Sequence, residues 1–321
     1  MKFLGIGSAL PKKVVSNDDL AQVMDTSDEW IRSRTGIGTR HIAVEETTTS
    51  MSVEAAGKAL KDAGVSAEEL DLIIAATVSP DYIFPTLACE VQSALGAVNA
   101  TAFDLGAGCS GFLFALATAD AYLRTGRFRK ALVIGAETLS KMVDWEDRST
   151  CVLFGDGAGA AVISAEGNGL LSMVQGSDGA GGMALSCKNR PVNNIYHKLG
   201  PQQYSFTQMN GREVYKFAVQ TVPKAVSEAL EKAQVPIEEV KYFLLHQANI
   251  RIIESVAKRL HQPMEKFPTN LEKCGNVSAA SVPILLDDVL KQGLLQKGDK
   301  VVLAGFGAGL TWGSCVIEWQ A

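Results

Sequence analysis

The chain has 321 residues, of which 47% are hydrophobic and 20% charged, and its formal net charge is −5. This composition is typical of a globular protein with a sizeable core, and it excludes a largely disordered chain. The acidic balance also excludes a basic field over the whole protein, although not a local basic patch, so we expect no nucleic-acid partner.

The first eleven residues, MKFLGIGSALP, predict a strand and a turn rather than a signal peptide. Of the two longest charge-free segments, residues 105–119 are too short to span a membrane as a helix, and residues 301–317 contain four glycines. The six cysteines are scattered, with no CxxC pair, which is typical of a reduced intracellular protein without a zinc site. We therefore expect a cytoplasmic protein with no membrane span and no metal ion.

The chain contains an internal repeat. Residues 55–76 align without a gap with residues 225–246, and seven of the 22 positions are identical. Each copy predicts an amphipathic helix, a short loop and a continuous apolar strand, which is typical of a parallel strand covered on both faces. A turn, a helix and another strand follow in both copies. We interpret the repeat as a duplication that divides the chain into two related α/β halves, 1–170 and 171–321; chance similarity between two α/β units is the alternative.

Three further segments have distinctive compositions. Residues 186–211 are polar and lack periodicity, which indicates a functional or disordered loop. The segments FGDGAGAAVIS and LAGFGAGLTWGS both contain GxGxG, but each continues into a strand-like segment, whereas a phosphate-binding loop needs a helix next. We therefore predict no nucleotide site in either segment, and a backbone N–H donor for an oxyanion in the second.

Cys109 lies in GAGCSG, a turn between the apolar strand ATAFDL and a predicted helix. The flanking glycines allow a sharp bend and the close approach of another group. Free N–H groups and the positive end of the helix dipole favour a thiolate at this place, and the same N–H groups can stabilise an oxyanion. The structural alternative is a small cysteine buried in a core turn.

His246 and Asn276 are singled out by the repeat. His246 aligns with Ala76, so the fold does not need a polar group there, and the carboxyl end of a strand is where α/β sheets place ligands. Asn276 lies at the turn that corresponds to the Cys109 turn, so a pseudo-twofold would bring all three side chains to one centre. The structural alternatives are a capped histidine and an N-cap asparagine.

Several long motifs follow one another along the chain: DTSDEWIRSRTGI, the CSG turn at Cys109, DWEDRSTCVLFGDGAGAAV, LLHQANIRII, GNVSAAS and GFGAGLTWGS. They resemble the signatures of the thiolase-fold condensing enzymes, most closely the β-ketoacyl-[acyl-carrier-protein] synthase III family. The resemblance covers essentially the whole chain and implies an α/β, thiolase-like fold, a duplicated αβαβα five-layered sandwich, and a homodimer.

The resemblance also implies a reaction. A short acyl-CoA, usually acetyl-CoA, would join malonyl-acyl-carrier protein to give 3-oxoacyl-acyl-carrier protein, CoA and CO2, which is the first condensation of dissociated fatty acid synthesis. Coenzyme A would enter as part of a substrate, and no cofactor or metal is implied. A Claisen condensation of this kind needs a thioester-forming nucleophile and enolate stabilisation, which agrees with the residues found above.

The same resemblance implies roles for particular residues. Cys109 would be the acylated nucleophile, His246 and Asn276 would stabilise the enolate left by decarboxylation, and the N–H groups of Cys109 and Ala308 would hold the oxyanion. The other implied contacts are Trp30, Arg34, Arg148 and Asn249 for coenzyme A, Lys216, Gln247, Arg251 and Lys258 for the carrier protein, and Phe84 for the end of the acyl pocket, reached across the dimer interface. For Phe84 an ordinary core phenylalanine is the alternative.

The chain departs from the usual family pattern at Gly108, Ala308 and Val277, and none of these departures removes a catalytic atom. Two other functions stay open at this point. One is a thiolase-fold acyltransferase or thioester hydrolase that uses another acceptor, and the other is a non-catalytic acyl-binding protein. The arginine after LLHQAN favours a carrier-protein partner, and the complete Cys–His–Asn set argues against a non-catalytic role.

Overall fold

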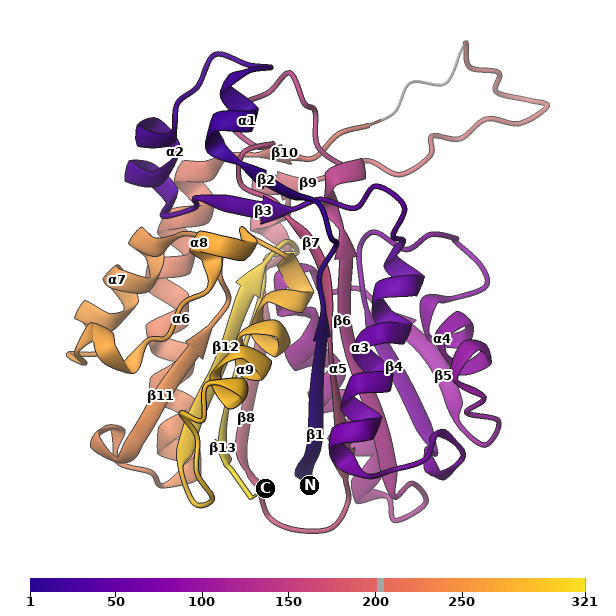
Figure 1. Cartoon of the computed structure of the whole chain (residues 1–321), viewed down its shortest axis with the longest axis vertical. Helices are drawn as coiled ribbons and strands as arrows, with labels where there is room; N and C mark the ends of the chain where they lie inside the picture. Colours follow the sequence, from indigo (N-terminus) through magenta and orange to yellow (C-terminus); the bar gives the residue numbers. More distant parts are fainter. Residues whose placement is uncertain (201–204, 321) are drawn as a thin grey trace.

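Two mixed sheets form the frame of the molecule (Figure 1). The computed structural model describes residues 1–200 and 205–320. The first sheet has the strand order β1-β7-β6-β4-β5 and the second has the order β11-β12-β13-β8. Their strands are β1 (Lys2–Ala9), β4 (Leu72–Ala76), β5 (Thr101–Leu105), β6 (Lys130–Thr138), β7 (Asp156–Ser164), β8 (Leu170–Ser177), β11 (Val240–Leu245), β12 (Lys300–Gly307) and β13 (Thr311–Glu318).

The strands that follow helices pair in parallel, as their continuous apolar sequences predict. In the first sheet β4 lies parallel to β5 and β6, and in the second β11 lies parallel to β12. The other large-sheet pairings, which involve β1, β7, β8 and β13, are antiparallel. Each parallel strand therefore ends at the same edge as its neighbour, which is where α/β sheets place ligands.

Helices cover both faces of each sheet, and alternate residues of a strand pack against different layers. In β4, Ile73 packs with the outer helices, whereas Ile74 packs with the central ones. In β12, Leu303 faces the central layer and Val302 faces the opposite outer layer. The outer helices of the first sheet are α3 (Thr48–Ala63) and α4 (Leu87–Leu95), the central helices are α5 (Gly111–Arg124) and α9 (Ser281–Lys291), and the outer helices of the second sheet are α6 (Gly211–Ala233) and α7 (Ile250–Arg259).

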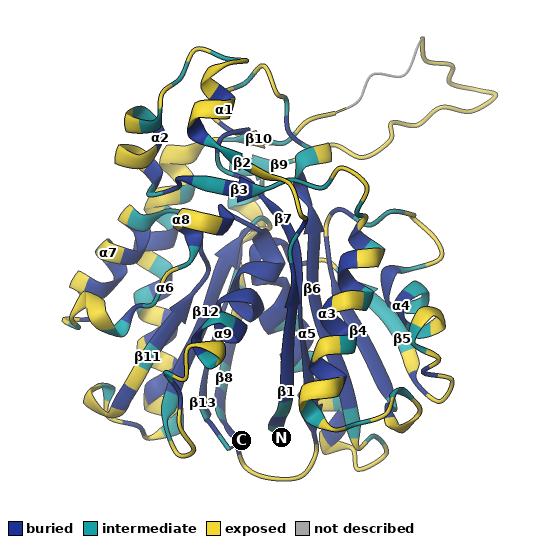
Figure 2. Ribbon diagram, in the orientation of Figure 1, coloured by how far each residue is buried: buried dark blue, intermediate teal, exposed yellow. Residues whose placement is uncertain are grey.

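This arrangement is the predicted five-layered αβαβα sandwich. The strands and the two central helices are largely buried, whereas each outer helix exposes one face (Figure 2). The apolar stripes of the outer helices explain this difference, because an amphipathic helix buries one face against its sheet. The prediction of fold class is thus confirmed.

The repeat is visible in the positions of short elements. The 3-10 turns η1 (Ala67–Glu69) and η5 (Ile237–Glu239) lie 170 residues apart, and so do η2 (Gly108–Ser110) and η7 (Ser278–Ala280). Each of the second pair leads directly into a central helix, α5 or α9. The division of the chain into halves at residue 170 stays a prediction.

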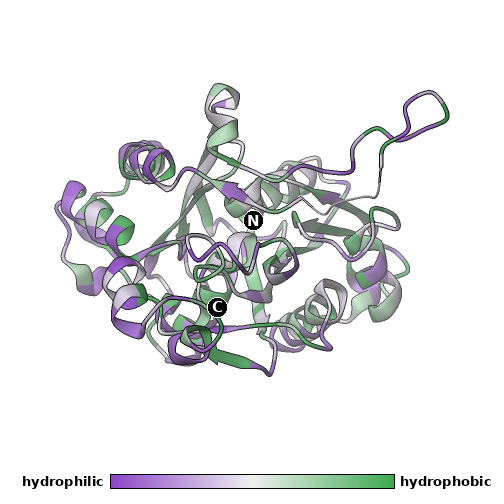
Figure 3. Cartoon of the chain, turned by 90° about the horizontal axis from the view of Figure 1, so that it is seen from above, coloured by the Kyte–Doolittle hydropathy of each residue, from purple (hydrophilic) through white to green (hydrophobic). Residues whose placement is uncertain are grey.

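The two glycine-rich segments are placed as their sequences predict. The first lies mostly within β7, and the second joins β12 to β13, so neither leads into a helix. Within the polar segment 186–211, residues 187–200 and 205–207 leave the body as extended chain between the paired strands β9 (Leu185–Ser186) and β10 (Gln208–Met209) (Figures 1 and 3). Residues 201–204 of that segment lie outside the described residues.

A small cap lies over the edge of the second sheet and α7 (Figure 1). It contains β2 (Val14–Ser16), α1 (Asn17–Ala21), α2 (Asp28–Thr35), β3 (Thr39–His41) and α8 (Leu271–Cys274). Within residues 1–200 and 205–320, no helix has both the length and the apolar character needed to cross a membrane.

Candidate active site

Cys109 lies in η2, at the amino end of α5, and its side chain is almost fully buried. Gly108 before it has a φ of +52°, which a glycine adopts without strain. Gly307 on β12 passes so close that a Cβ placed there would lie 2.8 Å from the Cys109 Cβ and 3.0 Å from its Sγ. Gly108 before the thiol and Gly307 on the neighbouring strand therefore leave just enough space for Cys109. The sequence predicts such a tight turn with a close approach of another group.

The electrostatics of this thiol differ from the expectation. Burial raises the pKa of Cys109 to about 12, the nearby carboxyl of Glu137 also raises it, and a hydrogen bond with Ser278 lowers it. The raised pKa runs against the prediction that the helix amino terminus favours a thiolate, because desolvation of the buried sulfur disfavours its charged form. The sulfur is held as a thiol, and its attack on a carbonyl requires a proton acceptor.

His246 directly follows β11, and its backbone N–H donates to the carbonyl of Ala304, 2.8 Å away. Its imidazole is buried and meets the Phe306 ring edge-on, with 5.3 Å between the ring centroids. Burial lowers the pKa of His246 to about 3, so the ring is neutral at physiological pH. Its Nδ1 has no hydrogen-bond partner among the described residues. A neutral imidazole can accept a proton or donate its single N–H.

Asn276 is held by its backbone on both sides. Its N–H donates to Leu153 O at 2.9 Å, and its carbonyl accepts from Gly155 N at 3.0 Å. Its side-chain Oδ1 accepts from Ser278 N at 2.9 Å. This last bond resembles the capping role of the structural alternative, but it uses only the oxygen of the amide. The NH2 group is then the part of the side chain that can donate to a ligand.

The three side chains predicted to converge do line one cavity. Cys109, His246 and Asn276 surround a space of about 140 Å³, together with Asn249 and Phe306. A second cavity of about 270 Å³ also borders Cys109 and is lined mainly by apolar residues, among them Val78, Leu139, Met142 and Phe154. Cys109 lines both cavities, so its sulfur can meet groups that enter from either one.

Ala308 lies beside the Cys109 turn. A Cβ added to Gly108 would come within 2.9 Å of Ala308 N, which shows how closely the two backbones approach. Thr311 ties them together, because its hydroxyl lies 2.9 Å from the carbonyl oxygens of both Ala107 and Ala308. The N–H groups of Cys109 and Ala308 thus belong to two segments fixed to each other, as an oxyanion hole needs.

Two arginines gather around Trp30 at the molecular surface. The guanidinium carbons of Arg34 and Arg148 lie 4.6 and 5.2 Å from the Trp30 ring centroid. Asn249 links this cluster to the buried cavity, since its Nδ2 donates to Arg34 O at 3.0 Å while the residue lines the cavity. Aromatic and guanidinium groups arranged in this way suit a nucleotide with phosphates.

Of the four residues predicted to contact the carrier protein, the three basic ones are exposed and Gln247 is buried. Lys216 on α6 and Arg251 and Lys258 on α7 are exposed. Gln247 is buried: its Nε2 donates to Leu245 O at 2.8 Å, and its Oε1 accepts from the backbone N–H of Asn270. Direct contact of Gln247 with a partner surface is therefore excluded in this conformation, and the side chain instead braces the strand that carries His246.

Phe84 is 83% exposed in the single chain, so the alternative of an ordinary core phenylalanine is wrong. It lines an open groove of about 530 Å³ with residues that include Lys141 and Arg190, and it is absent from the lining of the cavities that contain Cys109. Its action across a dimer interface stays a prediction.

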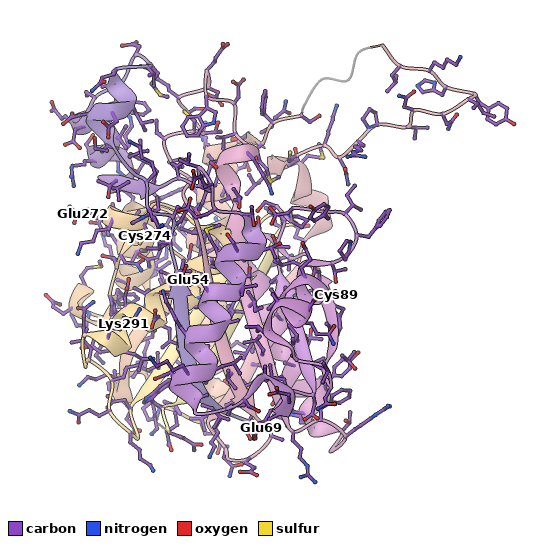
Figure 4. All side chains as sticks on the ribbon, turned by 45° about the vertical axis from the view of Figure 1, so that its right-hand side comes forward. Glu54, Glu69, Cys89, Glu272, Cys274 and Lys291 are labelled. Atoms are coloured by element: carbon purple, nitrogen blue, oxygen red, sulfur yellow. The ribbon has the colours of Figure 1, made fainter. Side chains whose placement is uncertain are left out.

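The other cysteines are dispersed. Cys89 and Cys274 lie on opposite sides of the molecule (Figure 4). Cys187 is exposed and lines the larger cavity together with Cys109, so experiments that label the nucleophile must distinguish these two thiols.

Two residues at the site were missed by sequence reasoning. Glu137, near the end of β6, is fully buried and accepts a hydrogen bond from Ser278 at 3.1 Å. Burial raises the pKa of Glu137 to about 7, and hydrogen bonds from its neighbours oppose that rise. The available signal was an acidic residue at the carboxyl end of the apolar strand KALVIGAET. Ser278 had no comparable signal in the sequence.

Comparison with known proteins identifies the family of the chain. The family described as 3-oxoacyl-[acyl-carrier-protein] synthase III matches residues 103–188, and its C-terminal part matches residues 230–319. The β-ketoacyl-[acyl-carrier-protein] synthase III of Clostridium acetobutylicum is 48% identical, covering 99% of this chain and 98% of its own. Synthase III 1 of Bacillus anthracis is 49% identical, with the same coverage.

A solved structure of the same family has the same fold as this chain. The crystal structure of 3-oxoacyl-[acyl-carrier-protein] synthase III from Aquifex aeolicus superposes with a TM-score of 0.93 at 46% identity, covering 99% of both chains. Sequence and fold thus match over nearly the full length. The chain belongs to the β-ketoacyl-[acyl-carrier-protein] synthase III family.

Proposed function

We propose that the chain catalyses the decarboxylative condensation of a short acyl-CoA, with acetyl-CoA as the preferred primer, and malonyl-acyl-carrier protein. The products are 3-oxoacyl-acyl-carrier protein, CoA and CO2, and the reaction starts dissociated fatty acid synthesis. The observation that carries the proposal is the single cavity lined by a buried thiol, a neutral histidine and an asparagine amide in a member of this family.

The first half-reaction is acyl transfer to Cys109. The sulfur attacks the thioester carbonyl of acyl-CoA, and the proton of the thiol passes to the departing sulfur of coenzyme A. The N–H groups of Cys109 and Ala308 stabilise the oxyanion that forms. The bond to the coenzyme A sulfur then breaks, CoA leaves with a proton, and the acyl group stays on Cys109 as a thioester.

The second half-reaction starts from the malonyl thioester. Its carbonyl oxygen accepts hydrogen bonds from the N–H of His246 and the NH2 of Asn276. Loss of CO2 leaves the bonding electron pair in an enolate held by these donors. The enolate carbon attacks the acyl carbon on Cys109, the sulfur leaves as a thiolate, and the thiolate takes a proton from the solvent to restore the thiol. Neither half-reaction transfers electrons to a redox group, so coenzyme A serves only as a carrier of the substrate acyl group.

Binding of the two large substrates is assigned to the surface. Trp30, Arg34 and Arg148 hold the adenine and phosphate end of coenzyme A, and Asn249 lies beside the pantetheine. Lys216, Arg251 and Lys258 form an exposed basic set that suits an acidic carrier protein. We further propose a cytoplasmic homodimer in which Phe84 of one subunit closes the acyl cavity of the other.

The test is acetyl transfer mapped by mass spectrometry. Incubation with acetyl-CoA should add one acetyl group on the peptide that contains Cys109, and Cys109→Ser should lower the transfer at least ~10³-fold. Cys187→Ser is the matched control, because that thiol lines the same cavity. Acetylation that persists in Cys109→Ser and disappears in Cys187→Ser would overturn the assignment.

The acceptor is tested separately. The acylated enzyme should form the 3-oxoacyl product with malonyl-carrier protein much faster than with malonyl-CoA. A preference for malonyl-CoA, or hydrolysis of the acyl-enzyme without condensation, would favour the alternative of an acyltransferase or thioester hydrolase with another acceptor.

A further inference from the structure

Glu137 is a buried carboxyl group that the mechanism above does not use. It lies on β6 with none of its surface exposed, and no cation forms an ion pair with it among the described residues. Burying a carboxyl without a cation is costly unless hydrogen bonds compensate. The repeat places Gly307 at the equivalent position, so the fold tolerates the absence of any side chain there. We therefore look for a role of the Glu137 carboxyl at the active site, in addition to any role in folding.

One carboxylate oxygen of Glu137 holds the segment that leaves β4. Its Oε2 accepts from Thr77 Oγ1 at 3.3 Å, from Val78 N at 3.1 Å and from Ser79 Oγ at 2.5 Å. Ser79 Oγ in turn accepts from Thr138 N at 2.8 Å. Val78 lines the larger cavity beside Cys109. This oxygen therefore fixes a wall of the larger, apolar cavity, which we take as the space for the acyl chain because Cys109 lines it.

The other oxygen holds the opposite side of the site. Glu137 Oε1 accepts from Ser278 Oγ at 3.1 Å, and Ser278 N donates to Asn276 Oδ1 at 2.9 Å. Ser278 has a φ of +45°, a left-handed conformation that is uncommon for a residue with a side chain and needs support from its surroundings. The bond to Glu137 supplies that support and so fixes the orientation of the Asn276 amide.

We propose that Glu137 is a positioning residue with two separable arms, one that orients Asn276 through Ser278 and one that sets the acyl-cavity wall through Thr77, Val78 and Ser79. The proposal rests on the function proposed above. It makes two properties depend on one carboxyl group: the rate of malonyl decarboxylation and the acyl chain-length preference.

The experiment removes the hydrogen bonds to each carboxylate oxygen of Glu137 separately, in the full-length enzyme. Ser278→Ala removes the donor to Oε1, and Ser79→Ala removes the closest donor to Oε2. Glu137→Gln disturbs both arms with little change in volume. Ser8→Ala is the matched control, since Ser8 is also a buried serine that hydrogen-bonds a buried carboxyl, that of Asp287, away from the site.

Two readouts are taken for every variant: release of CO2 from malonyl-carrier protein, and the ratio of butyryl to acetyl transfer onto Cys109. Ser278→Ala should slow CO2 release about tenfold, the effect of one hydrogen bond between well-placed groups. It also removes the hydrogen bond to the Cys109 thiol. That loss should slow butyryl and acetyl transfer alike and therefore leave their ratio unchanged. Ser79→Ala should change the ratio by roughly fourfold, the effect of one buried methylene, without slowing CO2 release. Glu137→Gln should change both, and Ser8→Ala neither.

The outcomes separate this proposal from the function on which it rests. If the wild-type enzyme neither acetylates Cys109 nor releases CO2, the proposed function fails. If the wild type does both, equal effects of Ser278→Ala and Ser79→Ala on the two readouts would overturn the two-arm role, and so would a Glu137→Gln enzyme that matches the wild type. Should Glu137→Gln fail to fold, the two serine variants still decide.

Discussion

The turn before α5 and the turn before α9 have nearly the same backbone and carry different side chains. Gly108 and Ser278, 170 positions apart, both have left-handed conformations, with φ values of +52° and +45°. Cys109 occupies the place that Ala279 occupies in the second turn. One copy of the turn therefore presents a nucleophile, and the other presents the support for an asparagine amide.

This difference shows how a repeated fold can assemble an asymmetric site. Each half supplies a helix amino terminus at the centre of the molecule, and the reaction needs two dissimilar functions there: acyl transfer and enolate stabilisation. A second pair follows the same logic, because His246 stands where the first half has Ala76. The comparison suggests substitutions that exchange residues between the two halves.

The largest expected effect is on the pH dependence of stability in His246→Ala. This substitution places in the second half the residue, alanine, that the first half has at the equivalent position, Ala76. The pKa of His246 is lowered to about 3 in the folded protein from an ordinary value of 6.5, so the unfolded chain binds the proton more readily. The stability that comes from this group is fully present above pH 6.5 and is lost as pH falls toward 3, with a total on the order of 4 kcal/mol.

The measurement is the free energy of unfolding by denaturant between pH 7 and pH 4. His246→Ala should lose less stability than the wild type as pH falls over this range. His261→Ala is the control, since that residue is exposed and lies outside the site. Parallel curves for the wild type and His246→Ala would show that the imidazole is not buried in its neutral form.

The next largest effect is a loss of stability and acetyl transfer in Gly108→Ser. This substitution places serine, the residue of the second turn at Ser278, in the first turn. The left-handed backbone costs about 1 kcal/mol for a residue with a side chain, and the new Cβ would approach Ala308 N to 2.9 Å, so overpacking adds about 1–3 kcal/mol. The thermal midpoint should fall, and acetyl transfer should slow because the two oxyanion donors are forced apart. Differential scanning calorimetry with an acetyl-transfer assay checks both.

The reciprocal change, Ser278→Gly, is the control for backbone strain. It relieves the left-handed conformation and adds no atoms, so any slowing of acetyl transfer should come only from the lost hydroxyl that hydrogen-bonds Cys109 and should match that of Ser278→Ala. If Gly108→Ser behaves like the wild type, the close approach of the two turns is not needed for catalysis.

How much of this site follows from the sequence depends on the range of the contacts. Cys109, His246 and Asn276 were predictable because each lies at a turn or strand end that the repeat marks. The Glu137–Ser278 bond joins residues 141 positions apart, and no periodicity reports such a contact. Gln247 was assigned to the carrier protein by the motif resemblance, which does not report burial; its side chain folds back onto Leu245 and the backbone near Asn270.

The fold followed from patterns that act over short distances. Continuous apolar strands after amphipathic helices predicted the parallel pairs, and the motif resemblance predicted the layers. The raised pKa of Cys109 runs against the expected thiolate for a physical reason: the helix terminus is recognisable in a sequence, but the depth of burial that raises this pKa is a property of the packed molecule.

A smaller effect is expected for Phe84→Ala. If Phe84 of a partner subunit closes the acyl cavity, removing its ring should shift preference toward longer acyl-CoA primers by roughly fourfold per added methylene, since each buried methylene contributes ~0.8 kcal/mol. Acetylation of Cys109 should continue. Acyl-CoA competition assays on a variant confirmed to be dimeric would check this, and an unchanged chain-length profile would remove Phe84 from the pocket.

The smallest effect is expected for Arg251→Glu. Charge pairs at an exposed rim mainly alter the encounter rate and its salt dependence, so the variant should use malonyl-carrier protein several-fold less well at low salt than the wild type. Acetyl transfer from acetyl-CoA should be spared. Arg259→Glu, one helical residue beyond Lys258, is the matched charge reversal. Normal carrier-protein kinetics in Arg251→Glu at low salt would place the docking surface elsewhere.

The central claim is that the two turns serve different half-reactions, and Asn276→Ala tests it most directly. Acetyl transfer to Cys109 and CO2 release from malonyl-carrier protein are measured on the same preparation under single-turnover conditions. The account predicts that acetyl transfer stays close to the wild-type rate while CO2 release falls ~10²–10³-fold, the effect of losing one oxyanion donor. Equal losses in both half-reactions would contradict it.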